Sequence, residues 1–271
     1  MKRMAILIAS PTVNLSGFDP NPVQSATNSI EYWKYLLKTP RLGSWIDRTE
    51  IEYRSDWNKQ SLKDFIRSLI DIDYIFLVYC GHGARFPKQC CTNPMSEDDL
   101  EDYILLNKGR EKVRLEEIRA EIASVTDKAT MLIEACRGNN WQMPDGATPI
   151  TVPQDLINEQ EDKSREEWMN QLRGCGSSGV VLIQSCSPGG ETYANAQFTL
   201  FSKAIFDVVE SAIFPMNIGD VYNRAYDKTV LYSYNLGEQK PTCYPDSDTV
   251  NYPFVLTDGY KIAAQFIPKE S

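Results

Sequence analysis

The chain has 271 residues, of which 42% are hydrophobic, so it can bury a substantial core without disulfides or a structural metal. Its 28 Lys and Arg residues against 37 Asp and Glu residues give a net charge of −9, which repels nucleic-acid phosphates and anionic membrane surfaces and attracts basic peptides. No apolar stretch approaches the roughly 20 residues that cross a bilayer. These properties predict one globular domain over residues 1–271 that binds neither nucleic acid nor membranes.

The first residues, MKRMAILIAS, imitate a secretion signal, but their apolar run is short and no small-x-small cleavage site follows it. This run is better explained as a buried strand. Together with three similar runs it is rich in β-branched residues and lacks alternation, which predicts central strands of a mainly parallel sheet. The four runs are MAILIA (4–9), YIFLVYC (74–80), ATMLIEA (129–135) and GVVLIQSC (179–186), with a more exposed strand at 49–54 and a last one at 252–256.

Apolar residues three and four positions apart predict helices between and after these strands, at 29–37, 61–70, 114–125, 199–214 and 217–232. This alternation indicates an α/β protein. Two segments interrupt it. Residues 84–110 are expected to form a hairpin or loop excursion, and residues 139–163 an exposed insertion. After the insertion, Ser164 and Glu167 form a capping-box pattern that predicts the start of a short helix.

The cysteines and the single histidine limit the metal and redox chemistry of the chain. Seven cysteines without a paired spacing pattern are typical of a reducing compartment, which predicts a cytoplasmic location. Zinc needs closely spaced Cys and His ligands, but Cys90 and Cys91 are adjacent and no Cys-x-x-Cys occurs. We therefore expect no metal and no other cofactor.

The histidine, His82, lies in CGHG at the carboxyl end of the second apolar run. Catalytic and ligand-binding groups collect at the carboxyl ends of parallel strands, and flanking glycines let a substrate approach the backbone closely. The alternative is a histidine packed in a glycine-rich turn.

The next run ends in EACRGN, which places Cys136 at the corresponding carboxyl end. Neighbouring strands lie about 4.8 Å apart, so His82 and Cys136 are expected to face each other across a cleft. A cysteine nucleophile needs a nearby base, and an imidazole can later protonate the leaving amine. The alternative role of a small buried hydrophobe suits four other cysteines better, namely Cys80, Cys175, Cys186 and Cys243.

These motifs resemble the caspase and metacaspase superfamily of cysteine peptidases, and most of all prokaryotic caspase-like proteins. The caspase signature is Gln-Ala-Cys-[Arg/Gln/Gly]-Gly with a histidine about 50 residues upstream. Here EACRG covers 134–138, and His82 precedes Cys136 by 54 residues. The segments VLIQSCSPGGETY and QKPTCYPDSDTVNYPFVL are similar to the family's cleft-lining and closing stretches. The resemblance implies a caspase-like three-layer sandwich, with helices flanking a mainly parallel six-stranded sheet.

The resemblance also implies roles for individual residues. Cys136 would be the nucleophile and His82 the general acid and base, with the backbone N–H groups of Gly83 and Cys136 forming the oxyanion hole. No third member of the dyad is implied. Glu134 stands where caspases that cut after aspartate have glutamine and where metacaspases have an acid that pairs with a substrate Arg or Lys. The alternative for Glu134 is a salt bridge to Arg137 or Arg85.

Further pocket residues are carried over on weaker grounds. Asp19 follows the first strand, where the family places part of its specificity pocket, but Asp-Pro is also a common turn start. Cys80 stands where metacaspases often have serine and would line the same pocket, or it is simply a small strand residue. An acidic run could suggest the calcium dependence of some metacaspases, but its spacing does not match an EF-hand, and a solvated charged surface is commoner. This run comprises Glu97, Asp98, Asp99, Glu101 and Asp102.

Taken together, these observations predict a cysteine endopeptidase (a caspase-like thiol protease) that cleaves protein or peptide substrates after Arg or Lys. Cleavage after Asp is the alternative within the class, and Glu134 opposes it by charge repulsion. A catalytically silent binding module is a second alternative, although both His82 and Cys136 are present. A doubly wound nucleotide-binding protein would need a glycine-rich loop after the first strand, which residues 10–14 lack.

A peptidase without a recruitment domain needs control. We expect an activating partner protein, a small signal molecule or proteolytic processing, and a role in bacterial stress, cell death or anti-phage (antiviral) defence. Lys163 and Arg165 lie in EDKSREEW, where a peptidase specific for basic residues could cut itself. An uncut surface loop is the alternative.

Overall fold

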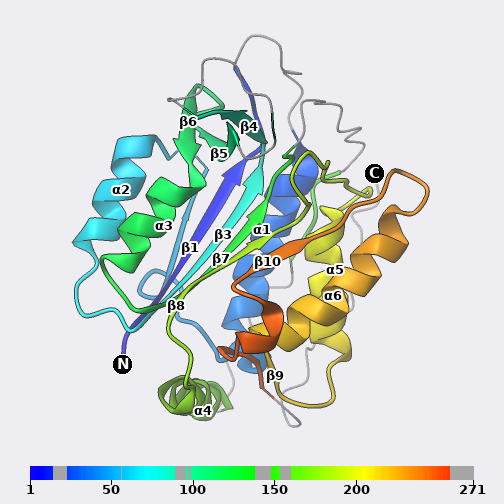
Figure 1. Cartoon of the computed structure of the whole chain (residues 1–271). Coiled ribbons are helices and arrows are strands. Elements are labelled where there is room, and N and C mark those ends of the chain that lie inside the picture. Colours follow the sequence, from blue (N-terminus) through cyan, green and yellow to red (C-terminus); the bar gives the residue numbers. More distant parts are fainter. Residues whose placement is uncertain are drawn as a thin grey trace.

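The computed structural model describes residues 1–14, 23–55, 57–88, 96, 99–137, 148–152 and 160–256. Its centre is a six-stranded sheet in the order β10-β8-β7-β3-β1-β2 (Figure 1). The strands are β1 (Arg3–Ser10), β2 (Ile51–Arg54), β3 (Tyr74–Gly81), β7 (Lys128–Glu134), β8 (Gly179–Gln184) and β10 (Thr242–Tyr244). All neighbouring pairs are parallel except β10 with β8. The α/β fold with a mainly parallel six-stranded sheet is therefore confirmed.

Helices cover both faces of this sheet, because the apolar strands present buried side chains on both sides. On β1, Ala5, Leu7 and Ala9 belong to one core cluster, whereas Ile6 and Ile8 belong to the other. In Figure 1 the first face is covered by α1, α5 and α6, and the second by α2 and α3. The bounds are α1 (Gln24–Lys38), α2 (Lys59–Ser68), α3 (Leu115–Ala123), α5 (Leu200–Ser211) and α6 (Ile218–Ser233).

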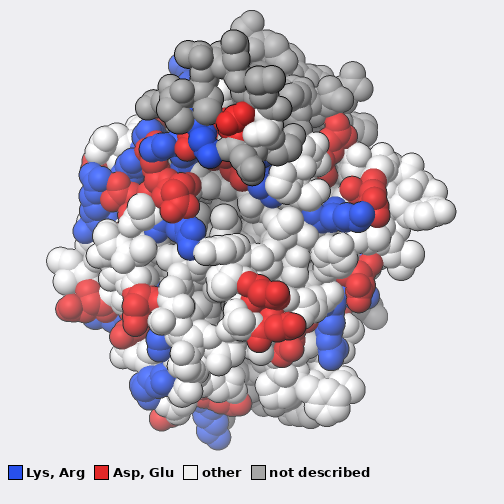
Figure 2. Space-filling model, viewed as in Figure 1, with Lys and Arg blue, Asp and Glu red and all other residues white. Residues whose placement is uncertain are grey.

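Two of these helices begin with complete capping boxes that satisfy their first backbone N–H groups. In α2 the box pairs Asn58 with Ser61, and in α6 it pairs Asn217 with Asp220. On the surface seen in Figure 2, acidic and basic side chains are interspersed. Ion pairs also link α2 with α3, such as Lys63 with Glu117 at 2.7 Å. In the part of the chain that the structure describes, no helix has the length and apolarity to span a bilayer.

The excursion expected at 84–110 is a three-stranded antiparallel sheet in the order β4-β5-β6. Its strands are β4 (Gly83–Pro87), β5 (Leu100–Leu106) and β6 (Glu111–Arg114). Because β4 begins directly after His82, this small sheet rises from the carboxyl end of β3, at the upper end of the molecule in Figure 1.

The last strand expected near 252–256 is present as β11 (Pro253–Val255). It pairs with the short β9 (Met216–Asn217), outside the main sheet. The sixth strand of the main sheet is β10 instead. It escaped prediction because it has only three residues, between Pro241 and Pro245, and depends on pairing with β8 for its existence.

The prediction that a capping box at Ser164 starts a helix is wrong, because helix α4 (Gln160–Gly174) begins four residues earlier. The Ser164 side chain is fully buried and hydrogen-bonds the hydroxyl of Ser44 at 2.6 Å. Further along the helix, Trp168 packs on Trp45 and Tyr74, with ring centroids 5.5 and 5.4 Å apart. The helix is thus docked at the amino end of β3, the lower end in Figure 1.

Candidate active site

Three strand ends converge on the candidate site. Cys80 of β3 lies opposite Glu134 of β7 in the parallel register, so His82 and Cys136 each lie two residues beyond a paired position. Gly81 lies opposite Ser10, and a Cβ at Gly81 would lie 2.4 Å from the Ser10 carbonyl oxygen. Only glycine therefore lets β1 and β3 approach this closely where they end.

The segment that carries His82 touches the segment that carries Cys136. A Cβ on Gly83 would lie 2.6 Å from the Cβ of Ala135 and 3.0 Å from the carbonyl oxygen of Cys136. Gly83 thus lies against the nucleophile segment at van der Waals distance, a contact that a larger residue would push apart. The chain segments that carry the two residues of the predicted dyad are therefore in contact.

The His82 ring is 7% exposed and is oriented by a backbone carbonyl. Its Nε2 atom lies 3.1 Å from the carbonyl oxygen of Pro11, the first residue after β1. A carbonyl only accepts, so Nε2 donates, and Nδ1 is the acceptor atom of the neutral ring. No third member of the dyad was expected from the sequence, and this role of Pro11 could not be predicted, because a main-chain oxygen leaves no signal in residue type.

The Cys136 thiol is held in a closed setting. The side chain is 7% exposed, and the backbone N–H of Thr192 donates to Sγ at 3.4 Å. Burial raises the pKa of this thiol to about 12, so in the substrate-free chain it is protonated at neutral pH. A base must therefore remove the proton when substrate is bound.

Glu134 is 1% exposed and lies under the same strand end. It accepts hydrogen bonds from the hydroxyls of Thr199 and Ser202 and from the backbone N–H of Ser202, which places the carboxyl at the amino end of α5. Burial nevertheless dominates and raises the pKa of Glu134 to about 7. These partners could not be predicted from the sequence, because the first of them, Thr199, lies 65 residues after Glu134.

The arginines considered as partners of Glu134 bind another carboxylate. Arg137 and Arg85 both pair with Asp102 of β5, at 2.7 and 3.3 Å. Glu134 is instead bonded to uncharged groups. Cys80 is fully buried near Glu134 and hydrogen-bonds Ser202, which also donates to Glu134. Burial and the nearby Glu134 raise the pKa of the Cys80 thiol.

Other residues singled out in the sequence are placed as follows. Asp19 lies outside the described residues, as do Glu97 and Asp98. Glu101 pairs with Arg114 at 3.5 Å. Within the described ranges, no group of three His, Cys, Asp or Glu side chains is arranged to hold a metal ion.

Lys163 and Arg165 both lie on α4 rather than in an irregular loop. The Arg165 guanidinium donates to the carbonyl oxygen of Ser44 at 3.0 and 3.1 Å. Most of the insertion before them, 138–147 and 153–159, lies outside the described residues. Because α4 packs at the amino end of β3 and His82 follows its carboxyl end, the length of the strand, about 26 Å, separates α4 from the dyad.

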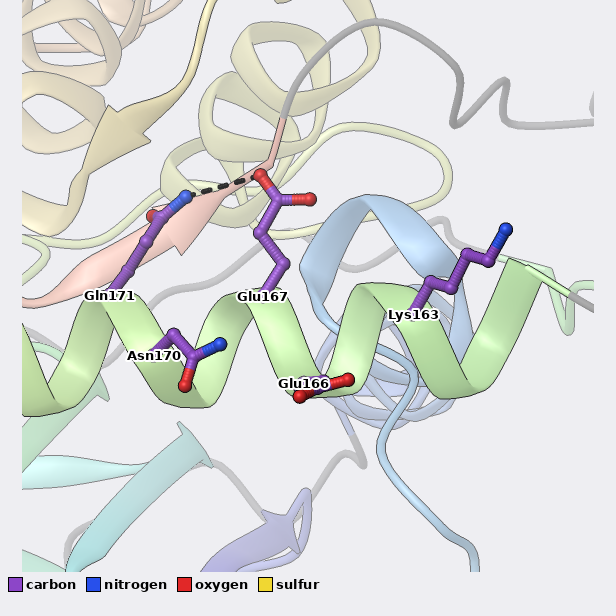
Figure 3. A pocket seen from close by; sticks show the side chains of 5 residues that line it. All are labelled: Lys163, Glu166, Glu167, Asn170 and Gln171. Carbon is purple, nitrogen blue, oxygen red and sulfur yellow. Dashed lines mark hydrogen bonds between the residues drawn. The ribbon is translucent and has the colours of Figure 1, made fainter.

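A surface hollow lies on α4, and its described lining residues include no cysteine or histidine that could form a second catalytic site. Figure 3 shows its described lining side chains spread along this one helix, with the amide of Gln171 donating to Glu167 at 3.4 Å. The lining residues are Lys163, Glu166, Glu167, Asn170 and Gln171. The candidate active site therefore stays at the strand ends.

A comparison with known proteins shows the family of the chain. A family model described as the caspase domain matches residues 23–252, which include both His82 and Cys136. The chain belongs to this family. No curated protein matches the chain.

Two solved structures share the caspase-domain fold. The first is protein GSU0716 of Geobacter sulfurreducens, with a TM-score of 0.56 and 13% identity over 95% of this chain and 100% of that one. The second is caspase-1 of Spodoptera frugiperda, with a TM-score of 0.56 and 14% identity over 97% of this chain and 92% of that one. At these identities the likeness supports the fold of the caspase domain alone.

Proposed function

We propose that this caspase domain is a cysteine endopeptidase that uses a His82–Cys136 dyad and cleaves proteins after Arg or Lys. The observation that carries the proposal is the close packing of the two segments at the ends of β3 and β7, with Gly83 against Cys136. The Pro11 carbonyl supports it further, because it holds the His82 ring in the tautomer in which Nδ1 accepts a proton.

The proposed reaction begins with transfer of the Cys136 proton to Nδ1 of His82. The thiolate then attacks the carbonyl carbon of the scissile bond, and the carbonyl oxygen becomes an oxyanion that the backbone N–H groups of Gly83 and Cys136 stabilise. His82 gives its proton to the leaving amine, which leaves a thioester on Cys136. Water, deprotonated by His82, hydrolyses the thioester and restores the thiol.

Substrate binding must first uncover the nucleophile. In the substrate-free chain the backbone N–H of Thr192 donates a hydrogen bond to Sγ of Cys136. The segment around Thr192 therefore has to move before a peptide can reach the sulfur. This closed setting supports the proposal that a partner or small signal molecule activates the domain, as expected of a regulated effector peptidase in the cytoplasm of a bacterium under stress, in programmed death or in phage defence.

Glu134 is the proposed determinant of specificity. Two opposite charges about 4 Å apart at an effective dielectric near 20 attract by about 4 kcal/mol before desolvation losses, which suffices to choose Arg or Lys over a neutral residue. A substrate aspartate would be repelled by the same carboxylate. An incoming guanidinium would replace hydroxyl donors that now serve Glu134, and its planar fork suits two acceptor oxygens.

A panel of fluorogenic peptides that differ only in the residue before the scissile bond tests this proposal. We expect the wild type to hydrolyse the Arg and Lys members and to leave the Asp member intact, with no hydrolysis by Cys136→Ala. Hydrolysis of the Asp member would establish the alternative specificity. A silent binding module would hydrolyse none of the panel, even under conditions in which iodoacetamide, added to a separate sample, shows that the Cys136 thiol is accessible.

Self-cleavage follows a restricted pattern under this specificity. Residues 138–162 contain no Lys or Arg, so beyond Arg137 a basic-specific peptidase can cut before β8 only from Lys163 onward. Peptidases bind their substrates extended, so we propose that cleavage after Lys163 or Arg165 requires α4 to unwind. We expect Trp168→Ala, which removes the ring that packs on Trp45, to accelerate the appearance of these termini at least tenfold.

Mass spectrometry of the purified chain measures these termini over time. The matched control is Trp57→Ala, which removes an equally buried tryptophan beside α2 and should leave the rate of self-cleavage unchanged. Every new terminus should also disappear in Cys136→Ala. If Trp168→Ala yields no Cys136-dependent terminus between residues 139 and 173, the domain does not process itself here.

A further inference from the structure

Arg137, the residue that follows the proposed nucleophile, hydrogen-bonds groups on two other segments of the site through its guanidinium. Arg137 is 9% exposed, and its Nε and Nη2 atoms donate to the two oxygens of Asp102 at 3.0 and 2.7 Å. Its Nη1 atom donates to the carbonyl oxygen of Cys186 at 3.1 Å. A bidentate guanidinium–carboxylate pair fixes both the separation and the relative plane of its partners, which a lysine cannot do.

Asp102 ties this arginine to the histidine side of the site. It lies on β5, where it is paired with Arg85 of β4, the strand that begins directly after His82. On the same strand, the backbone N–H of Leu105 donates to the carbonyl oxygen of His82 at 3.0 Å. One short strand therefore contacts His82 through its backbone and the residue after Cys136 through a side chain.

The backbone of Arg137 also anchors the segment that covers the thiol. Its N–H donates to the carbonyl oxygen of Gly190 at 2.9 Å, and its carbonyl accepts from Gly189 at 3.1 Å. Two residues beyond Gly190, Thr192 contacts Sγ of Cys136. A shift of Arg137 would therefore displace the nucleophile and its cover together.

From these contacts we infer that Arg137 and Asp102 are positioning residues, which hold Cys136 at the distance from His82 that proton transfer requires. The inference rests on the proposed function, because it assigns these residues to the same dyad. Removing the carboxylate leaves a nearly buried guanidinium without its charged partner, so the nucleophile segment is expected to move. A displacement of about 1 Å in such a group costs on the order of 100-fold in rate.

The test compares Asp102→Asn with Glu101→Gln, a variant of the neighbouring acid on β5, which pairs with Arg114 away from the dyad. We expect Asp102→Asn to lower kcat for the arginyl peptide between about 10-fold and 100-fold, with KM changed less than threefold. Glu101→Gln should retain the wild-type kcat. Asp102→Glu, which keeps a carboxylate, should recover part of the loss.

A second measurement does not depend on turnover. The rate at which iodoacetamide alkylates Cys136 is followed against pH, and Asp102→Asn should displace this profile relative to the wild type and to Glu101→Gln. If Asp102→Asn does not fold, Arg137→Lys is judged by the same two measurements. The inference is overturned if the folded variant keeps its kcat and its alkylation profile, or if Glu101→Gln changes both equally. A wild type that cleaves no peptide refutes the proposed function, and the alkylation profiles still decide this inference.

Discussion

Replacing Cys136 with alanine should abolish cleavage of the arginyl peptide, and replacing His82 with alanine should lower kcat by about 10⁴-fold or more. The physical reason lies in the resting thiol. Burial raises the pKa of this thiol to about 12, so very little thiolate is present at pH 7 and the nucleophile depends on a base placed beside it. The Pro11 carbonyl orients His82 for this task.

The pH dependence of the residual activity distinguishes loss of the base from loss of the fold. In His82→Ala, we expect peptide hydrolysis to keep rising with pH above 9, because only the thiolate form of Cys136 reacts and no base removes its proton. In the wild type, hydrolysis should reach its plateau at a lower pH, because the neutral His82 ring removes the proton. Circular dichroism serves as the control, since both side chains lie after their strands and should be dispensable for folding. An active His82→Ala variant at pH 7 would exclude the dyad.

Glu134→Gln should remove most of the preference for a substrate arginine. Citrulline is the uncharged counterpart of arginine, so the ratio of kcat/KM for the two peptides isolates the contribution of charge and cancels the ionisation of the dyad. We expect a ratio on the order of 10²–10³ in the wild type at pH 8, from the attraction of about 4 kcal/mol less desolvation, and a ratio near one in Glu134→Gln.

This ratio should also depend on pH, because the pKa of Glu134 is raised to about 7. Below that value the carboxyl is protonated and the preference for arginine should fall, whereas in Glu134→Gln it should not change with pH. The free energy of unfolding also depends on the ionisation of Glu134, but it falls with rising pH whereas the preference for arginine increases. A raised folded-state pKa contributes stability that is complete below about 4.5, the ordinary value, and is lost as the pH rises through about 7, so Tm of wild type should fall relative to Glu134→Gln over this range.

Glu191 supplies the matched control for this experiment. It is a partly exposed carboxylate that lies next to Thr192, accepts a hydrogen bond from Tyr193, and acts electrostatically on the Cys136 thiol. Glu191→Gln should retain the dependence of the ratio on pH. If it loses the arginine preference while Glu134→Gln keeps it, the specificity belongs to the exposed acid.

The main sheet could be predicted because burial on both faces leaves a strong local signal. The runs that became β1, β3, β7 and β8 are continuous, apolar and β-branched, and each lies between turns. In contrast, β10 is set by pairing with β8, and three residues carry no periodicity of their own. Helix α4 packs on Trp45 and Ser44, so Ser164 is a buried contact within the helix, which the capping pattern at Ser164 did not reflect.

The site shows the same division between local and long-range determinants. Glycines beside His82 and the residues around Cys136 mark the strand ends directly in the sequence. Cys80 and Glu134 share a face because they lie opposite each other in the parallel pairing of β3 with β7. The orienting Pro11 carbonyl and the hydroxyls on Glu134 depend on chain segments that meet only in the folded state, so residue types alone gave no sign of them.

The edge-on packing of Trp168 against Trp45 provides an intrinsic optical signal. Both rings are nearly fully buried, and the Arg3 guanidinium lies over them at 4.3 Å from one centroid and 4.9 Å from the other. Indole fluorescence shifts to longer wavelengths when the ring enters water. Undocking of α4 can therefore be followed in stopped flow on the unlabelled chain, far from the thiol that the inhibitors of such an assay would modify.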